Sequence, residues 1–429
     1  SMIGSLKHSY LDQSSKLFYS YIDPDGLPFQ YTDGYGKITF SGENGSKANV
    51  FGLLYNDKVN YQSISDLNWR NVGAGANFIL IPSGNPVLID GNIAYSSYNI
   101  TLQEANLSDR YSRISGFNGG LNFTYFLGED DLKYGIKIVG FSTDYNFTNE
   151  ANRVIQQQES TTELALYVKY KKKLGKLIID PSFRLHYYAS LSNLSPEPRI
   201  GAKYNATDKL RLKVAAGMYS QNLIAANSDR DVVNLFNGFL SGPDNLQKNF
   251  TDINGNTREV RHSLQKANHF IAGIEIDVTR HININLEGYY KMFTQVTNIN
   301  RNKIFEDNAA NSFRDDLLKK DFIIETGDAM GVDFVLNYDY KDINIYAVYS
   351  LGKVTRWDGV QEYFPVFDRR HNVNFVGSYE FGRDRLWEFN ARWNLGSGFP
   401  FTQTLGFYEQ YTFSDGANTD LASGNGSVG

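Results

Sequence analysis

Cysteine is absent from this chain of 429 residues. Its absence excludes disulfide bonds, thiolate metal sites and cysteine nucleophiles, and with them any redox chemistry that depends on sulfur. Histidine is scarce as well, with six residues in the whole chain. This composition is compatible with an oxidising compartment.

Long apolar runs are also missing. A transmembrane helix needs about 20 consecutive, mostly apolar residues, whereas the longest apolar runs here, such as 78–81, span only a few. The sequence therefore predicts no transmembrane helix. Ser1-Met2-Ile3 does not open a basic segment followed by an apolar one, so we expect no signal peptide in the sequence shown.

Neither sign of charge dominates, since 42 Lys and Arg stand against 47 Asp and Glu, for a net charge of −5. The basic residues form no block longer than the three lysines at 171–173. Nucleic-acid binding requires a broad basic patch or stripe. We therefore expect no nucleic-acid partner.

Aromatic residues and alternating patterns are what the chain has in abundance. It contains 29 Phe and 29 Tyr. Apolar and polar residues alternate with a period of two over long stretches: Ile274 and Ile276 share one face, Glu275 and Asp277 share the other, and the alternation resumes after a turn at 279–281. Such a pattern is typical of a two-faced β-hairpin.

The same unit recurs along the chain and predicts about eight hairpins, or about sixteen strands. Short turns are expected at 42–46, 82–86, 128–131, 171–175, 206–209, 279–281, 341–342 and 382–385. Long polar connections are expected at 57–71, 144–162, 221–266, 294–331 and 353–371, and further strands around 17–22 and 401–408. Short turns therefore lie at one end of the strands and long loops at the other.

Strand length decides among the sandwich, the propeller and the barrel. Strands of soluble proteins usually hold about 5 to 6 residues, whereas these hold about 9 to 12, the length that crosses a bilayer at about 45° tilt. We predict an all-β fold, a transmembrane antiparallel β-barrel of at least about 16 strands, with an apolar face toward lipid and a polar face toward the lumen. A large soluble sandwich with one wet face is the alternative.

Several motifs occur in a specific order. Pro365 precedes Asp368-Arg369-Arg370-His371 at the opening of a strand, and Gly-Ser-Gly-Phe-Pro-Phe-Thr at 396–402 closes the next strand. Supporting stretches are 198–204, 229–236 and 331–336. In this order the motifs resemble the barrel of TonB-dependent outer-membrane receptors of the Bacteroidetes type, over about residues 10–420.

The resemblance implies parts that this sequence does not contain. The family has a signal peptide, a TonB-contacting segment, a plug domain and a barrel of about 22 strands. By this comparison, residues 1–416 form an incomplete transmembrane β-barrel without its opening and closing strands, residues 417–429 form a Gly-, Ser- and Asn-rich tail or loop, and the plug is absent. Unpaired strand edges in lipid cost several kcal/mol per backbone group, so something else is expected to complete the barrel.

Signatures of catalysis and metal binding are missing from the sequence. It has no nucleophile elbow, no Walker loop and no His-Glu-x-x-His, so we expect no catalytic residues, no cofactor and no enzymatic activity. His262 and His269 have no carboxylate at recognisable ligand spacing. The acidic stretches 229–231 and 23–26 fall short of a calcium loop, and 23–26 is predicted to be a turn. We expect no metal site.

The segment 221–266 is the strongest candidate for a functional site, because loops longer than about 15 residues are uncommon unless they have a function or are disordered. Its charged residues followed by aromatics are able to line a binding surface for a polar ligand. The alternative is that the segment packs on the barrel mouth. The candidate ligand-binding residues are Asp229, Arg230, Asp231, Asn234, Phe236 and Phe239.

From the resemblance we expect a receptor in the outer membrane of a Gram-negative bacterium that takes up a nutrient by TonB-dependent transport. The TonB complex would be reached through the plug, and outer-membrane lipid would surround the barrel. A surface lipoprotein accompanies the barrel in some relatives and is a candidate partner.

Two other functions remain open: a passive porin, since about 16 to 18 strands would leave an aqueous channel, and a structural subunit of a larger outer-membrane complex. Glycan, peptide, siderophore and metal chelate all remain open as substrates.

Overall fold

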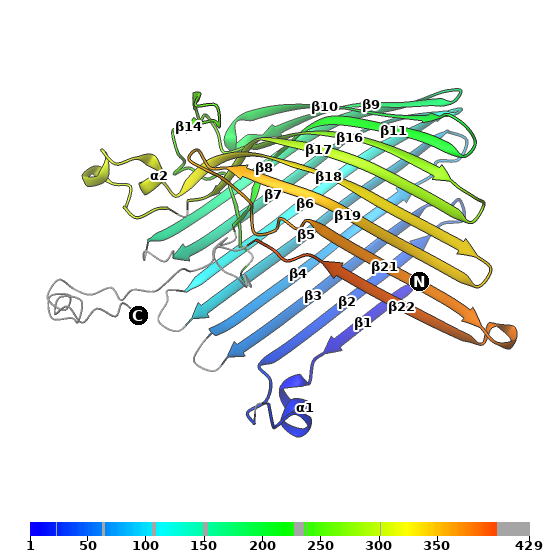
Figure 1. Ribbon diagram of the computed structural model, residues 1–429, viewed down its shortest axis with the longest axis horizontal. Helices are drawn as coiled ribbons and strands as arrows, with labels where there is room; N and C mark the ends of the chain where they lie inside the picture. Colours follow the sequence, from blue (N-terminus) through cyan, green and yellow to red (C-terminus); the bar gives the residue numbers. More distant parts are fainter. Residues whose placement is uncertain are drawn as a thin grey trace.

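The structure is a computed structural model that describes residues 1–22, 24–61, 65–104, 109–148, 153–226, 236, 238–300 and 302–400. Most of them form one antiparallel sheet of 18 strands that curves like the wall of a barrel (Figure 1). The strands are β1 (Met2–His8), β2 (Phe29–Ser41), β3 (Lys47–Tyr61), β4 (Ser65–Leu80), β5 (Val87–Glu104), β6 (Arg110–Leu127), β7 (Asp130–Thr148), β8 (Val154–Leu174), β9 (Leu177–Tyr188), β10 (Asn193–Asn205), β11 (Leu210–Gln221), β16 (Gln265–Asp277), β17 (Ile282–Ile299), β18 (Phe322–Tyr340), β19 (Ile343–Trp357), β20 (Glu362–Tyr363), β21 (His371–Phe381) and β22 (Trp387–Gly396).

Neighbouring strands pair in chain order, from β1 to β11 and on through β16, β17, β18, β19, β21 and β22, while the short β20 extends the edge of β19. This meander confirms the predicted all-β antiparallel barrel wall. The wall is not closed, because the pairings of the described residues join β1 only to β2 and β22 only to β21.

The remaining elements lie in the connections. Two small sheets, β12 (Leu223–Ala226) with β13 (Gly238–Ser241) and β14 (Asn249–Thr251) with β15 (Thr257–Glu259), belong to the segment between β11 and β16. The helices are α1 (Leu11–Phe18), α2 (Asp316–Lys319), η1 (Ala189–Leu191), η2 (Ala309–Asn311) and η3 (Arg383–Arg385). Within the described residues, no helix combines the length and the hydropathy needed to span a membrane.

Short turns are found where the alternation breaks, but the prediction at 171–175 was wrong in extent, because β8 runs to Leu174 and the turn lies at 175–176. The connections at 42–46, 206–209 and 341–342 join consecutive strands as expected, and Gly45 has the positive φ of +84° that its turn requires. We call this side of the wall the turn end and the opposite side the loop end. The turn end is on the right of Figure 1; the long connections with α2 and β14 are on the left, and α1 is at the bottom.

Several predicted loops were wrong in extent, because the strands run further toward the loop end. The predicted connection 57–71 is reduced to the residues between Tyr61 and Ser65, and 144–162 to those between Thr148 and Val154. Likewise, β17 and β18 take up most of the two ends of 294–331, and β19 and β20 take up part of 353–371. The strand predicted around 17–22 was also wrong, since it is the end of α1 and a turn; the strand predicted around 401–408 lies outside the described residues.

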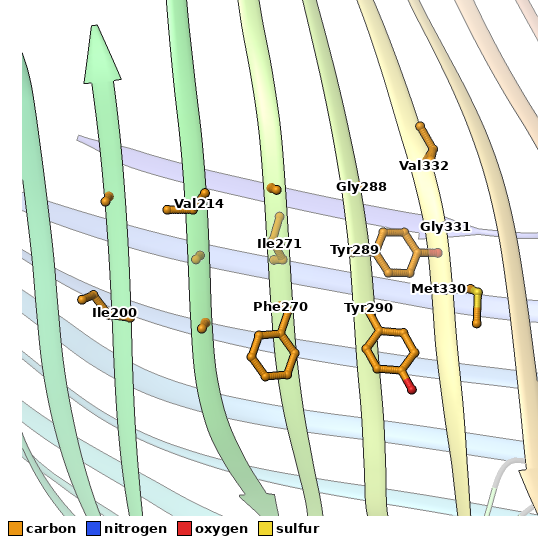
Figure 2. A pocket seen from close by; sticks show the side chains of 14 residues that line it. Ile200, Val214, Phe270, Ile271, Gly288, Tyr289, Tyr290, Met330, Gly331 and Val332 are labelled. Atoms are coloured by element: carbon orange, nitrogen blue, oxygen red, sulfur yellow. The ribbon is translucent and has the colours of Figure 1, made fainter.

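One face of the wall is apolar and exposed. Val214, Ala272, Gly288 and Val332 are register partners across four neighbouring strands on this face. A groove of about 730 Å³ lies here. Figure 2 shows side chains that line it, with Phe270 and Tyr290 side by side next to Met330. A wall whose exposed face is apolar is what a bilayer requires of a barrel, and we call this face outward.

The other face carries charge toward the lumen. Near the turn end, the Arg211 guanidinium lies 2.9 Å from Glu275 and 2.6 Å from Asp277, and Lys213 Nζ lies 2.9 Å from Glu275 and 3.3 Å from Glu287. These residues alternate with the outward aliphatics along β11, β16 and β17. The alternation of charged and apolar residues in the sequence therefore has the predicted cause: charged residues face the lumen and apolar residues face outward.

Candidate ligand-binding mouth of the barrel

The lumen changes character at the loop end, where the inward face of the wall becomes apolar. Leu67 and Ile100 are 1% exposed, and Tyr145 and Ile155 are fully buried. These side chains come from β4, β5, β7 and β8 and belong to one buried apolar cluster. A core at this position requires something inside the mouth to bury it.

The covering element is the connection between β11 and β16, residues 222–264, which we call the mouth segment. Its Ile224, Phe236 and Leu240 are 2%, 2% and 0% exposed and lie in the same cluster as Tyr145 and Ile155. Although β9 and β10 separate β11 from β8 in the sheet, β13 lies against β6, β7 and β8. The mouth segment therefore folds into the lumen and packs on the wall.

Hydrogen bonds fix the mouth segment to this wall. The Phe239 backbone N–H donates to Ser112 Oγ at 2.9 Å, and the amide of Gln157 donates to the Ser241 carbonyl at 3.0 Å. The hydroxyls of Thr143 and Ser241 lie 3.2 Å apart. Ser112, Thr143 and Gln157 are buried, so each bond gives a hydrogen-bond partner to a polar group that water does not reach.

The residues predicted to bind a ligand are placed only in part. Asp229, Arg230, Asp231 and Asn234 lie outside the described residues. Phe236 packs on the ring of Tyr145 with centroids 6.3 Å apart, and the partly buried Phe239 meets Tyr98 edge to face at 5.6 Å. Both aromatics thus pack on the barrel mouth, and whether the segment also binds a ligand stays a prediction.

Sequence reasoning missed the residues that hold the segment. Ile224 and Leu240 were not singled out, nor were their wall partners Ser112, Thr143 and Gln157. A signal was present, because Tyr145 and Phe147 continue the inward alternation of β7 beyond the point where its outward face becomes polar. That continuation indicates a strand with an apolar partner inside the lumen.

A pocket of about 410 Å³ opens at the rim, between β8, η1 and the mouth segment. Glu159, Asp244, His262 and Ser263 are among the residues that line it. Burial, together with the Asp244 carboxylate, raises the pKa of Glu159 above its ordinary value. Burial, with the nearby charge of Lys266, lowers the pKa of His262, which therefore stays neutral at pH 7.

A second connection, between β17 and β18, contacts β8 at the same rim. Lys303 is 3% exposed; its ammonium lies 2.5 Å from Asp321 and donates to the Val154 carbonyl at 3.3 Å. On its outer side, Lys320 donates to Asp307 at 2.7 Å and lowers the pKa of that carboxyl. Through Lys303, this connection therefore links the start of β18 to the loop end of β8.

The two histidines weighed as metal ligands lie in different surroundings. His262 Nδ1 is 3.2 Å from the Gln295 amide, whereas the His269 ring stacks on Tyr219 at 4.4 Å. Among the residues that the structure describes, no three His, Cys, Asp or Glu side chains come together as a metal site would require.

Known proteins share the fold of this chain but little of its sequence. No family model matches the sequence, and no curated protein matches it. Among solved structures, it is similar to the FrpB iron transporter of Neisseria meningitidis (TM-score 0.58, 9% identity, 86% of this chain and 60% of that one). It is also similar to the alcaligin outer-membrane receptor FauA of Bordetella pertussis (0.56, 9%, 86% and 61%) and the copper transporter OprC (0.54, 11%, 92% and 62%).

These similarities define the class of fold. The chain has the architecture of outer-membrane β-barrel receptors and transporters, with an apolar band outside, a polar lumen and a mouth partly filled by a long connection. The chain spans about six tenths of the length of the solved structures it matches. The neighbours are named as transporters and receptors, and none of the three is named as an enzyme.

Proposed function

We propose that this protein is an outer-membrane receptor that takes up a nutrient by TonB-dependent transport. The observation that carries the proposal is the mouth segment, whose described part packs on the lumen side of the barrel wall. The fold shared with FrpB, FauA and OprC supports the same class. With short turns toward the periplasm and long loops outside, the mouth segment lies on the side from which a nutrient arrives.

The two free sheet edges support a larger barrel. Both β1 and β22 have one unpaired side in the described residues, and a bilayer does not tolerate unpaired backbone groups. We therefore propose that residues 1–416 are part of a barrel of about 22 strands, a size at which the lumen holds a plug. In this proposal residues 417–429 are a tail or loop, and the plug carries the contact with the TonB complex.

Ligand capture is assigned to the mouth segment. Asp229, Arg230, Asp231 and Asn234 would offer polar contacts, while Phe236 and Phe239, which follow that stretch, pack on Tyr145 and Tyr98 of the wall. The sugar, peptide or chelate nature of the nutrient stays open, as does the Bacteroidetes type. A surface lipoprotein over the loop end is the proposed partner for capture.

Conductance in a planar lipid bilayer separates the receptor from the porin. The protein extracted intact from its native membrane is expected to conduct little, because the proposed plug would fill the lumen. Deletion of residues 223–264 alone should raise conductance only slightly if a plug is present. A steady open channel in the unaltered protein would contradict the proposal and favour the porin.

A further inference from the structure

The connection between β1 and β2 carries an unusual set of exposed apolar residues. Within residues 10–22, which we call the α1 segment, Leu17 is 76%, Phe18 67%, Tyr21 80% and Ile22 59% exposed. Exposed apolar side chains gathered in one short segment mark a surface that meets another apolar phase. The α1 segment therefore needs an account of what covers it.

The polar side of α1 faces the protein. Ser15 is fully buried; its hydroxyl donates to the Leu11 carbonyl at 2.5 Å and accepts the Leu27 backbone N–H at 2.7 Å. Asp12 and Lys16 line a pocket of about 490 Å³ together with Lys58 of β3. A surface helix of a soluble protein has the opposite arrangement, with its apolar side packed on the core.

The location of the α1 segment indicates its partner. Lys58 follows Leu54 on the same face of β3, and Leu54 is part of the outward apolar face. Because α1 packs beside Lys58, it lies directly beyond the loop-end border of the apolar band. Figure 1 shows α1 projecting from the loop end of β1 and β2, away from the strands of the wall.

We propose that the α1 segment is a membrane-interface anchor, and that its partner is the lipid of the leaflet at the loop end of the barrel. Short amphipathic segments at this level bury apolar side chains at the boundary between headgroups and acyl chains. Tyrosines are favoured there because their rings are apolar and their hydroxyls form hydrogen bonds with water. The lysines 16 and 58 lie at the level where anionic headgroups would accept their charge.

Site-directed spin labelling tests this proposal, and these 429 residues suit it because they contain no cysteine, so that an introduced cysteine is the only labelling site within them. Phe18→Cys and Tyr21→Cys would carry a nitroxide in full-length protein reconstituted into phosphatidylcholine vesicles. Ile93→Cys, 65% exposed on the outward face of β5, is the lipid control. Phe313→Cys, 74% exposed between η2 and α2, is the matched aromatic control in water.

The readout is the ratio of collision rates with oxygen, which enters lipid, and with a water-soluble nickel chelate. We expect the ratios at 18 and 21 to shift away from that at 313 and toward that at 93. Ratios equal to the one at 313 would show that the segment is in water. Low collision rates with both reagents would show that protein covers it. Either result overturns the proposal, whereas a water-like ratio at 93 would overturn the membrane assignment itself.

Discussion

At the scale of single residues, the mouth of the barrel depends on a few fully buried side chains. Leu240 has no exposed surface and lies between the mouth segment and the wall. Leu240→Ala should destabilise the docked mouth segment by roughly 2–5 kcal/mol, through lost burial and the cavity left behind. Hydrogen exchange at 238–242 in proteoliposomes would rise, while Leu212→Ala, on the lipid-facing side of β11, would leave it unchanged. Equal exchange in both variants would contradict the assigned packing.

Ser112 makes a more specific contribution, because it bonds the backbone of β13. Ser112→Ala removes the acceptor of the Phe239 N–H and leaves that group buried without its partner. The cost is expected to be about 1–3 kcal/mol, seen as faster exchange of the Phe239 amide. Ser115→Ala, on the outward face of the same strand, is the control. Unchanged exchange in Ser112→Ala would show that water replaces the hydroxyl.

The pH dependence of docking follows from Glu159. Its pKa is raised by burial and by Asp244 of the mouth segment. A raised carboxyl pKa means that docking is strongest below the ordinary pKa of glutamate and weakens as the pH rises through the raised value. Protection at 243–248, corrected for intrinsic exchange, should therefore fall over that pH window relative to the protection in Glu159→Gln, in which the lowered pKa of His262 still acts. The same slope in both proteins would exclude Glu159 as the cause.

At the scale of elements, the wall has two faces that differ in what they tolerate. Val214 and Ala215 are neighbours on β11, with Val214 outward in the apolar band and Ala215 inward. Val214→Arg places a charge in lipid at an expected cost of about 2–4 kcal/mol near the midplane, whereas Ala215→Arg joins the polar lumen. The yield of folded barrel in lipid, read from heat-modifiable gel mobility, should fall for Val214→Arg alone. Equal yields would contradict the assignment of the faces.

The elements also show which parts of the fold the sequence predicts. Alternation and turn residues were enough for the barrel wall and for turns such as 206–209, because both are local and repeat with a period of two. The loop-end extension of β7 left a local signal in Tyr145 and Phe147, but the mouth segment that buries Tyr145 and Ile155 could not be predicted, because it is distant from them in sequence. Phe236 and Phe239 were found as candidates from the sequence. Their partners Tyr145 and Tyr98 were not, because they too are distant in sequence.

At the scale of the whole molecule, the central claim is that this wall belongs to a larger, plugged receptor. The described strands leave β1 and β22 each with a free edge, and lipid does not satisfy such edges. More strands and a plug would close the barrel and fill the lumen below the mouth segment. In this proposal, ligand capture takes place at the loop end and coupling to TonB at the turn end.

The intact mass of the protein extracted from its native membrane, with sequencing of both termini, tests this claim most directly. The account predicts a mass well above the 48.6 kDa of this chain, with additional N-terminal sequence that folds as a plug and resists protease until the barrel is denatured. A mass near 48.6 kDa would contradict the plugged receptor. It would leave a smaller barrel, a porin or a subunit of a complex.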